Sequence, residues 1–238
     1  MAKDFLWGEE FKLDVARGKT RGASVRNIFG QNSAQTASFR AVWELSNSVD
    51  YVFPSSALTM TVNSNVADDG VVIKIIGLNS DYEEINEIIT LNNATPPTTT
   101  NQFFRINDVI TITGNAANDI TITNTGVTYA KIDAGKGRNQ AAIYTVPKDC
   151  SFYLYRIDGF TADSTGTAKP AKFRNFVTLS TGVELRVAEV EFFNNMNIQR
   201  RFPFKYSEKT DIVFQMSTFS STHPCSVFGE GVVVKETM

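Results

Sequence analysis

The side chains that most often carry catalysis are scarce in this chain, which has one histidine and two cysteines in 238 residues. His223 lies two positions before Cys225, with Pro224 between them, in a predicted loop. A general base must reach its nucleophile and needs a third group to orient it, and adjacency in sequence does not supply that geometry. We therefore interpret His223 as a loop residue, and we expect its substitution to leave any activity unchanged.

Three glutamates in one apolar stretch give the best argument for an enzyme. In a strand, Glu189 and Glu191 share a face, as the acid and the nucleophile of a glycosidase can. The same alternation puts apolar residues of 183–187 on that face, so we expect the charges to lie where the strand leaves the core. Glu184 forms an ordinary same-face pair with Arg186. A carboxylate-based glycoside hydrolase is therefore kept as a second alternative.

Metal and phosphate sites have no clear signature. One histidine and two distant cysteines do not make a zinc site of the usual kind, and Asp68-Asp69-Gly70 is typical of a turn rather than of a calcium loop. The sequence Gly135-Lys136-Gly137-Arg138 is a basic turn and not a phosphate-binding loop. We predict no catalytic residues, no metal ligands and no cofactor. Cys150 and Cys225 are expected to be free thiols, with a single bridge between them as the alternative.

Composition places the chain among folded globular proteins, with 42% hydrophobic and 20% charged residues. The net charge of −2 provides no general basic field, so no specific nucleic acid is expected as a partner. No apolar run approaches the roughly 20 residues of a membrane span, and the first residues lack the apolar core of a secretory signal. We expect synthesis and folding in a cytoplasm.

Short runs of alternating apolar and polar residues, separated by Asn, Gly, Asp, Ser and Thr, predict an all-β protein with a β-sandwich or jelly-roll fold. Residues 82–91 also fit a short helix, but the β-rich surroundings favour a strand. Residues 110–113 and 120–123 predict a hairpin with isoleucines inward. The predicted strands are 58–62, 71–76, 82–91, 110–113, 120–123, 127–132, 141–146, 152–157, 173–179, 183–193, 211–218 and 227–234.

Residues 1–40 differ from the rest and predict an extended N-terminal arm, ahead of a β-sandwich body at 41–238 with a subdomain boundary near 165–170. Residues 16–26 carry four basic side chains and no acidic one. A basic loop folded along its own domain is the alternative. The predicted assembly residues of the arm are two aromatic anchors and four basic side chains: Phe5, Trp7, Arg17, Lys19, Arg21 and Arg26.

Several short motifs occur together along most of the chain: Trp7-Gly8, Ala16-Arg17-Gly18, Phe29-Gly30-Gln31-Asn32, Val42-Trp43, Ile76-Gly77-Leu78-Asn79, Thr90-Leu91-Asn92, Tyr144-Thr145-Val146-Pro147, Tyr153-Leu154 and Glu208-Lys209-Thr210-Asp211-Ile212. In these motifs the sequence resembles a family of β-rich proteins encoded by tailed bacteriophages, notably those of marine bacteria. The resemblance implies a virion component such as a head decoration protein, a spike or a tail-associated protein. It supplies no catalytic residues to transfer.

The sequence thus predicts a non-enzymatic virion structural protein that acts in particle assembly within the bacterial host cytoplasm. Its expected partners are capsid or tail subunits and further copies of itself, since β-rich assembly subunits close their sheet edges with neighbours. The first alternative is a receptor- or glycan-binding module of a phage fibre or spike, with a host glycan as ligand. The position on the particle and the stoichiometry stay open.

Overall fold

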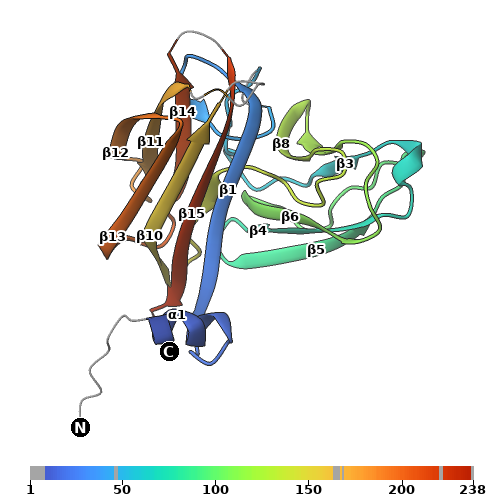
Figure 1. Ribbon diagram of the computed structural model, residues 1–238. Coiled ribbons are helices and arrows are strands. Elements are labelled where there is room, and N and C mark those ends of the chain that lie inside the picture. The colour runs from blue at the N-terminus through green and yellow to red at the C-terminus, as the bar shows by residue number, and fades with distance from the viewer. Residues whose placement is uncertain (1–8, 46–47, 163–166, 168, 220–221, 237–238) are drawn as a thin grey trace.

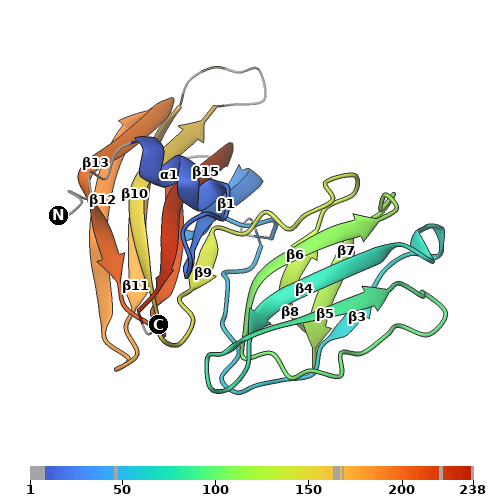
Figure 2. The ribbon, with the colours of Figure 1, turned by 90° about the horizontal axis from the view of Figure 1, so that it is seen from below.

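The computed structural model describes residues 9–45, 48–162, 167, 169–219 and 222–236, which form two β units lying side by side (Figures 1 and 2). The large unit contains a helix and nine strands: α1 (Glu9–Ala16), β1 (Ala23–Gln35), β2 (Arg40–Ala41), β9 (Ile143–Thr145), β10 (Cys150–Thr161), β11 (Pro170–Thr178), β12 (Glu184–Phe193), β13 (Asn195–Tyr206), β14 (Asp211–Thr218) and β15 (His223–Lys235). An inserted unit lies between β2 and β9 in the chain: β3 (Thr61–Asn63), the 3-10 turn η1 (Val66–Asp68), β4 (Val72–Leu78), β5 (Glu84–Thr90), β6 (Arg105–Thr113), β7 (Ile120–Asn124) and β8 (Val127–Ile132).

The large unit is one sheet that folds back on itself. Its strand order is β1-β15-β10-β13-β12-β11-β14-β2, and β9 also pairs with β14. Where the two ends of the sheet meet, the backbone N–H of Gln31 in β1 donates to the carbonyl of Gln140, at 3.2 Å. Gly30 is required at this closing point, because a Cβ there would collide with the Val42 carbonyl and with Ala142. The result is a two-layered, sandwich-like core.

Aromatic rings fill that core. Phe152, Phe173 and Phe214 are fully buried, and the rings of Phe173 and Phe214 meet edge to face with their centroids 5.6 Å apart. Gly229 and Gly231 of β15 make room for the Phe214 and Phe152 rings, since a Cβ at either position would overlap them. The predicted all-β class and sandwich-like architecture are confirmed. The jelly-roll connectivity stays a prediction.

The inserted unit packs two three-stranded sheets, β3-β7-β8 and β5-β4-β6, around a core of its own. The predicted strand over 82–91 is present as β5. The predicted hairpin of 110–113 with 120–123 is wrong, because β6 pairs with β4 while β7 pairs with β3 and β8. Ile120 and Ile122 are fully buried, but Ile112 is 44% exposed, so the two isoleucine runs do not face one core.

The N-terminal arm also differs from its prediction. Residues 9–16 form α1, and residues 23–35 form β1, which pairs with β15 from Ala23↔Val234 to Gln35↔His223. Buried Ile28 alternates with half-buried neighbours, and this pattern fixes β1 in the sheet. No helix in the described part of the chain is long and apolar enough to cross a membrane. The predicted boundary near 165–170 falls largely outside the described residues; the division that the structure shows is the inserted unit.

A buried ion pair joins the two units. Arg105 of β6 donates from Nε and Nη2 to the two carboxylate oxygens of Asp211 in β14, at 2.8 and 2.9 Å, and both side chains are less than one-tenth exposed. Thr145 Oγ1 donates to the same carboxylate at 2.5 Å, and Nη1 of Arg105 donates to the Pro54 carbonyl at 3.0 Å. The guanidinium also lies 3.9 Å from the ring centroid of Phe104. Each charge therefore has partners within the chain.

Further along β6, polar side chains form more hydrogen bonds to the large unit. Asn107 exchanges two hydrogen bonds with the backbone of Thr145 in β9, both at 2.9 Å. Asp108 accepts two hydrogen bonds from Arg138, both at 2.9 Å, and lies 3.9 Å from the guanidinium of Arg26 in β1. One strand of the inserted unit is thus bonded to three segments of the large unit, which fixes the two units relative to each other.

Replacing Asp211 by Asn leaves the Arg105 guanidinium buried without a counter-charge. We expect the free energy of unfolding in urea to fall by roughly 3–5 kcal/mol, the usual effect of breaking a buried pair from one side. The matched control is Asp119→Asn, because Asp119 is a half-exposed partner of Lys131, which also contacts Asp133. The Asp119→Asn control should lower the free energy of unfolding by about 1 kcal/mol or less. Equal losses in the two variants would contradict the assigned importance of the buried pair.

Candidate functional site

The predicted assembly residues of the N-terminal segment are not gathered into one surface. Phe5 and Trp7 lie outside the described residues. Arg17, Lys19 and Arg21 are exposed in the connection between α1 and β1. These three side chains are accessible to a partner, but they lie on a loop that follows the protein's own helix and not on a projecting arm.

Arg26 has a different role from the predicted one. It lies half-buried in β1, where Nη2 donates to the Asn107 carbonyl at 2.8 Å and the guanidinium lies 4.7 Å from the ring centroid of Tyr144. This side chain joins the two β units. Arg26 is therefore not among the residues that we expect to contact a neighbouring protein.

The large sheet is open between β12 and β13 (Figure 1). β12 pairs with β11 from Glu184 to Phe193, and β13 pairs with β10 from Asn195 to Tyr206, but the two strands pair with each other only at Phe193↔Asn195. Beyond that position each strand has one edge with no ladder partner in the described part of the chain. Long unpaired edges of this kind are sites where other strands add.

The corner between the two strands explains why they separate. Asn194 connects them with a positive φ of 70°, a conformation that Asn tolerates better than most residues. Its carbonyl accepts from the N–H of Thr161 at 2.8 Å, and its N–H donates to the carbonyl of Lys169 at 3.1 Å. Because the corner is bonded to β10 and to the residue before β11, each strand follows its own layer, and the two layers diverge.

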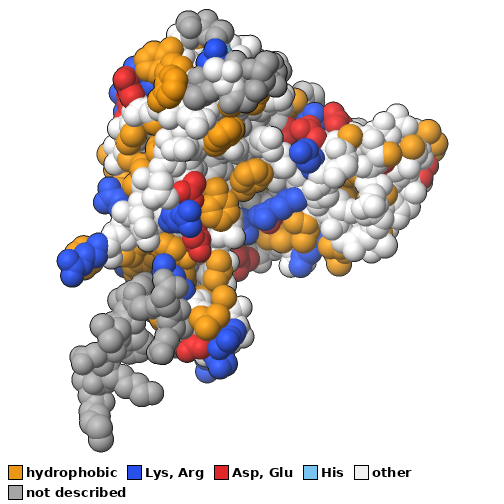
Figure 3. All heavy atoms as spheres, viewed as in Figure 1, with side chains coloured by type: hydrophobic (Ala, Val, Ile, Leu, Met, Phe, Trp, Pro, Cys, Tyr) orange, Lys and Arg blue, Asp and Glu red, His pale blue; other side chains and the backbone are white. Residues whose placement is uncertain are grey.

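Apolar side chains reach the surface around this opening (Figure 3). Phe192 and Phe204, one from each strand, are half-buried against the core. Phe193 is 66% exposed and Phe202 is 77% exposed, although rings of this size are usually buried. Exposed aromatic side chains beside an unpaired edge mark a surface that a partner would cover.

A large bulge in β13 presents Phe202 together with two positive charges. Leu154 pairs with Phe204 and Arg156 pairs with Gln199, so the four residues 200–203 stand opposite Tyr155 alone. The bulge has the sequence Arg-Arg-Phe-Pro, and its first three residues are exposed.

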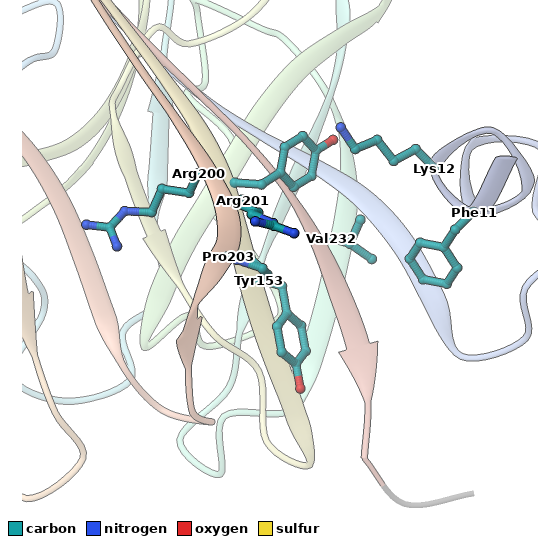
Figure 4. A pocket seen from close by; sticks show the side chains of 8 residues that line it. Phe11, Lys12, Tyr153, Arg200, Arg201, Pro203 and Val232 are labelled. Atoms are coloured by element: carbon teal, nitrogen blue, oxygen red, sulfur yellow. The ribbon is translucent and has the colours of Figure 1, made fainter. Parts of the chain in front are cut away.

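A small hollow lies beside the bulge (Figure 4). Its volume is about 90 Å³, and α1 contributes Phe11 and Lys12 to its lining. The Lys12 ammonium is 4.2 Å from the ring centroid of Tyr155, whose hydroxyl donates to Glu230 at 2.9 Å. Arg200 also lines the hollow, but its guanidinium points away from the other labelled side chains. The hollow is therefore basic and aromatic, and far smaller than the 300–1,000 Å³ of common ligand pockets.

A larger hollow of about 340 Å³ lies where the two units meet. Ser24 and Arg26 of β1, Glu84 of β5, Tyr144 of β9 and Lys235 of β15 are among its lining residues. Its volume falls in the range of ligand pockets, and charged groups of both signs converge on it.

The glutamates of β12 all lie on the outer face of the sheet. Glu184, Glu189 and Glu191 face Thr178, Arg174 and Lys172 of β11, which alternate with buried residues of that strand. A register shift beside Val187 reverses the alternation, so the glutamates do not share a face with the apolar residues as predicted. Glu191 forms an ion pair with Lys172 at 2.5 Å.

The histidine and the cysteines are placed by β15 and β10. His223 is the first residue of β15 and is buried, so its predicted position in a loop is wrong. Both cysteines are free thiols. Cys225 lies in β15, and Cys150 lies in β10 opposite Lys235 of β15. Cys225 and Lys235 are roughly 33 Å apart along β15, so the two cysteines are far from each other. Burial raises the pKa of Cys225, which keeps the thiol protonated.

The surroundings of Glu44 move the pKa of its carboxyl group far above the ordinary value. Burial raises its pKa to about 8, although the backbone N–H of Gln140 donates to Oε1 and opposes the shift. Its Oε2 is buried and has no hydrogen-bond partner. The sequence carries no signal for this property, because burial of Glu44 depends on the closing of the large sheet beside Trp43.

Among the described residues, no group of three or more His, Cys, Asp or Glu side chains is arranged to hold a metal ion. No protein-family model matches the chain, and no curated protein is significantly similar to it in sequence.

Glu44→Gln should remove a pH dependence of stability. Because the pKa of Glu44 is raised in the folded protein, the folded state holds a proton that the unfolded chain releases above pH 4.5 or so. The free energy of unfolding therefore falls as the pH rises from about 4.5 to 8, by at most about 1.4 kcal/mol per pH unit. Urea unfolding at pH 5, 6.5 and 8 should show wild type losing stability relative to Glu44→Gln.

The control for this measurement is Glu184→Gln, which removes one exposed carboxylate. A stability difference between wild type and Glu44→Gln that stays constant from pH 5 to pH 8 would show that the carboxyl group titrates alike in the folded and unfolded states.

Proposed function

We propose that this chain is a non-enzymatic structural subunit of a tailed-phage particle, and that it works by docking onto other virion proteins through the open edges of β12 and β13. The observation that carries the proposal is that β12 and β13 each have an edge without a ladder partner among the described residues, and that Phe193 and Phe202 of these strands are exposed. Aromatic and arginine side chains supply much of the binding energy in protein interfaces. Here both types are carried by β12 and β13.

The resemblance to β-rich phage proteins supports the setting of this proposal. Assembly would take place in the host cytoplasm, where thiols stay reduced, and both cysteines are free. The buried Arg105–Asp211 joint also suits a particle subunit, because it keeps two β units in one fixed arrangement. Phe5 and Trp7, with exposed Arg17, Lys19 and Arg21, remain proposed as a second contact with neighbouring subunits.

Phe202→Ser should exclude the protein from particles. Loss of one exposed aromatic anchor weakens binding by about 1.4 kcal/mol or more, which is tenfold in affinity. Tagged variants would be produced during infection, and the tag would be quantified in gradient-purified particles. We expect at least a tenfold loss for Phe202→Ser. Val66→Ser is the matched control, since Val66 is 67% exposed in η1 of the inserted unit.

A variant that lacks residues 1–8 tests Phe5 and Trp7 in the same assay. The deletion stops short of β1, because loss of residues 23–30 would break the pairing with β15.

Normal incorporation of Phe202→Ser would remove the β12–β13 surface from the proposal. Absence of the wild-type protein from purified particles would overturn the proposed function itself.

A receptor- or glycan-binding module is the second candidate, favoured by the 340 Å³ hollow between the units. Glu84 at its rim is exposed and accepts hydrogen bonds from ligand hydroxyls in this proposal. Glycan-array binding by the wild type that is lost in Glu84→Gln would support it. An array without a bound glycan would argue against it.

A further inference from the structure

The two open edges of this chain carry opposite charges. β12 contains three glutamates and one arginine, which gives a net charge of −2, whereas β13 contains two arginines and one lysine, a net charge of +3. Several of these groups have partners among the described residues: Glu191 pairs with Lys172, Lys205 pairs with Glu236, and the Arg200 guanidinium lies 3.3 Å from the ring centroid of Phe204. Both ion pairs are at least partly exposed and therefore weak, so neither cancels the difference between the edges.

This asymmetry decides which edges can meet. Two β12 edges brought together would place glutamates against glutamates, and two β13 edges would place arginines against arginines. A β12 edge against a β13 edge places opposite charges across the ladder, which is the favourable arrangement for cross-strand neighbours. The corner at Asn194 prevents one copy from joining its own two edges, because its hydrogen bonds to Thr161 and Lys169 hold the strands in separate layers.

We infer that the occupant of each open edge is a second copy of this chain, with β12 of one copy adding to β13 of the next. This inference rests on the proposed assembly function and names the partner. The contact would extend the β10-β13 layer of one copy with the β12-β11 layer of its neighbour. It would also cover exposed Phe202 of β13, together with Leu185 and Phe193 of β12, which are 77%, 43% and 66% exposed.

The contact is heterologous, because it uses different surfaces on its two sides. Every copy that uses β12 toward one neighbour still has β13 free for another. Contacts of this type close into rings or continue as open chains, depending on the rotation between neighbours. Either outcome gives the repeated arrangement that a particle component requires.

Charge reversal at one edge and then at the other tests the pairing. Variant one is Arg200→Glu with Arg201→Glu, which makes both edges negative. Variant two is Glu184→Lys with Glu189→Lys, which makes both edges positive and leaves the Glu191–Lys172 pair intact. We expect the wild type to associate in sedimentation velocity runs. Each variant alone should need an at least ~10-fold higher protein concentration to reach the same extent of association. A 1:1 mixture of the two variants should regain association to within about threefold of wild type.

Lys136→Glu with Lys148→Glu is the control for charge alone. Both residues are exposed, both lie outside β12, β13 and the N-terminal segment, and this variant changes the net charge by the same amount as variant one. It should associate as the wild type does. Far-ultraviolet circular dichroism of each variant shows whether the fold is kept.

Three results would overturn the pairing of β12 with β13: a wild type that stays monomeric at every concentration, variants that associate unchanged, or a mixture that does not recover. None of these results decides the proposed function, which depends on entry into particles. A monomeric wild type that still enters particles through Phe202 would keep the assembly role and replace the second copy with a different virion protein.

Discussion

The buried Arg105–Asp211 ion pair is the interaction on which the rest of this structure depends. Both charges are almost fully removed from water, so each needs the other. Further hydrogen bonds come from Thr145 to Asp211 and from Arg105 to the carbonyls of Pro54 and Phe104. The pair joins an inserted unit to the sheet that surrounds it in sequence. A buried bidentate pair of this kind has one good geometry, so it fixes orientation as well as contact.

The large unit is closed on the side that faces the inserted unit and differs on the opposite side (Figure 1). The sheet closes where β1 meets the segments around Val42 and Gln140, next to the joint with the inserted unit. Within the part of the chain that the structure describes, it does not close between β12 and β13, where a single pair of residues connects the two layers. One side of the sandwich is therefore completed within the chain, and the other presents backbone that a neighbour can complete.

Of the fifteen strands in the described residues, all but β1, β2 and β13 overlap runs that apolar patterning and turn signals predicted. The pairing was not predictable, because β6 and β7 have similar sequences but belong to different sheets. β13 was missed, since its bulge at 200–203 and Pro203 break the alternation. β1 was assigned to an arm because the basic stretch 16–26 overlaps its first residues. Its later residues belong to the sheet, and Gly30 is needed where two backbones approach closely.

The roles of the arginines in the candidate site could not be predicted from the sequence. Arg26 was predicted as an assembly residue because it belongs to the basic stretch 16–26, yet its guanidinium contacts the inserted unit. Arg200 and Arg201 gave no signal, although they stand exposed on the edge of an open sheet. An arginine that bonds to a buried carboxylate or carbonyl stabilises the fold, and one on an unpaired strand edge is available to a partner. Only the long-range pairing of strands separates the two cases, and that pairing is set by closure of the whole sheet.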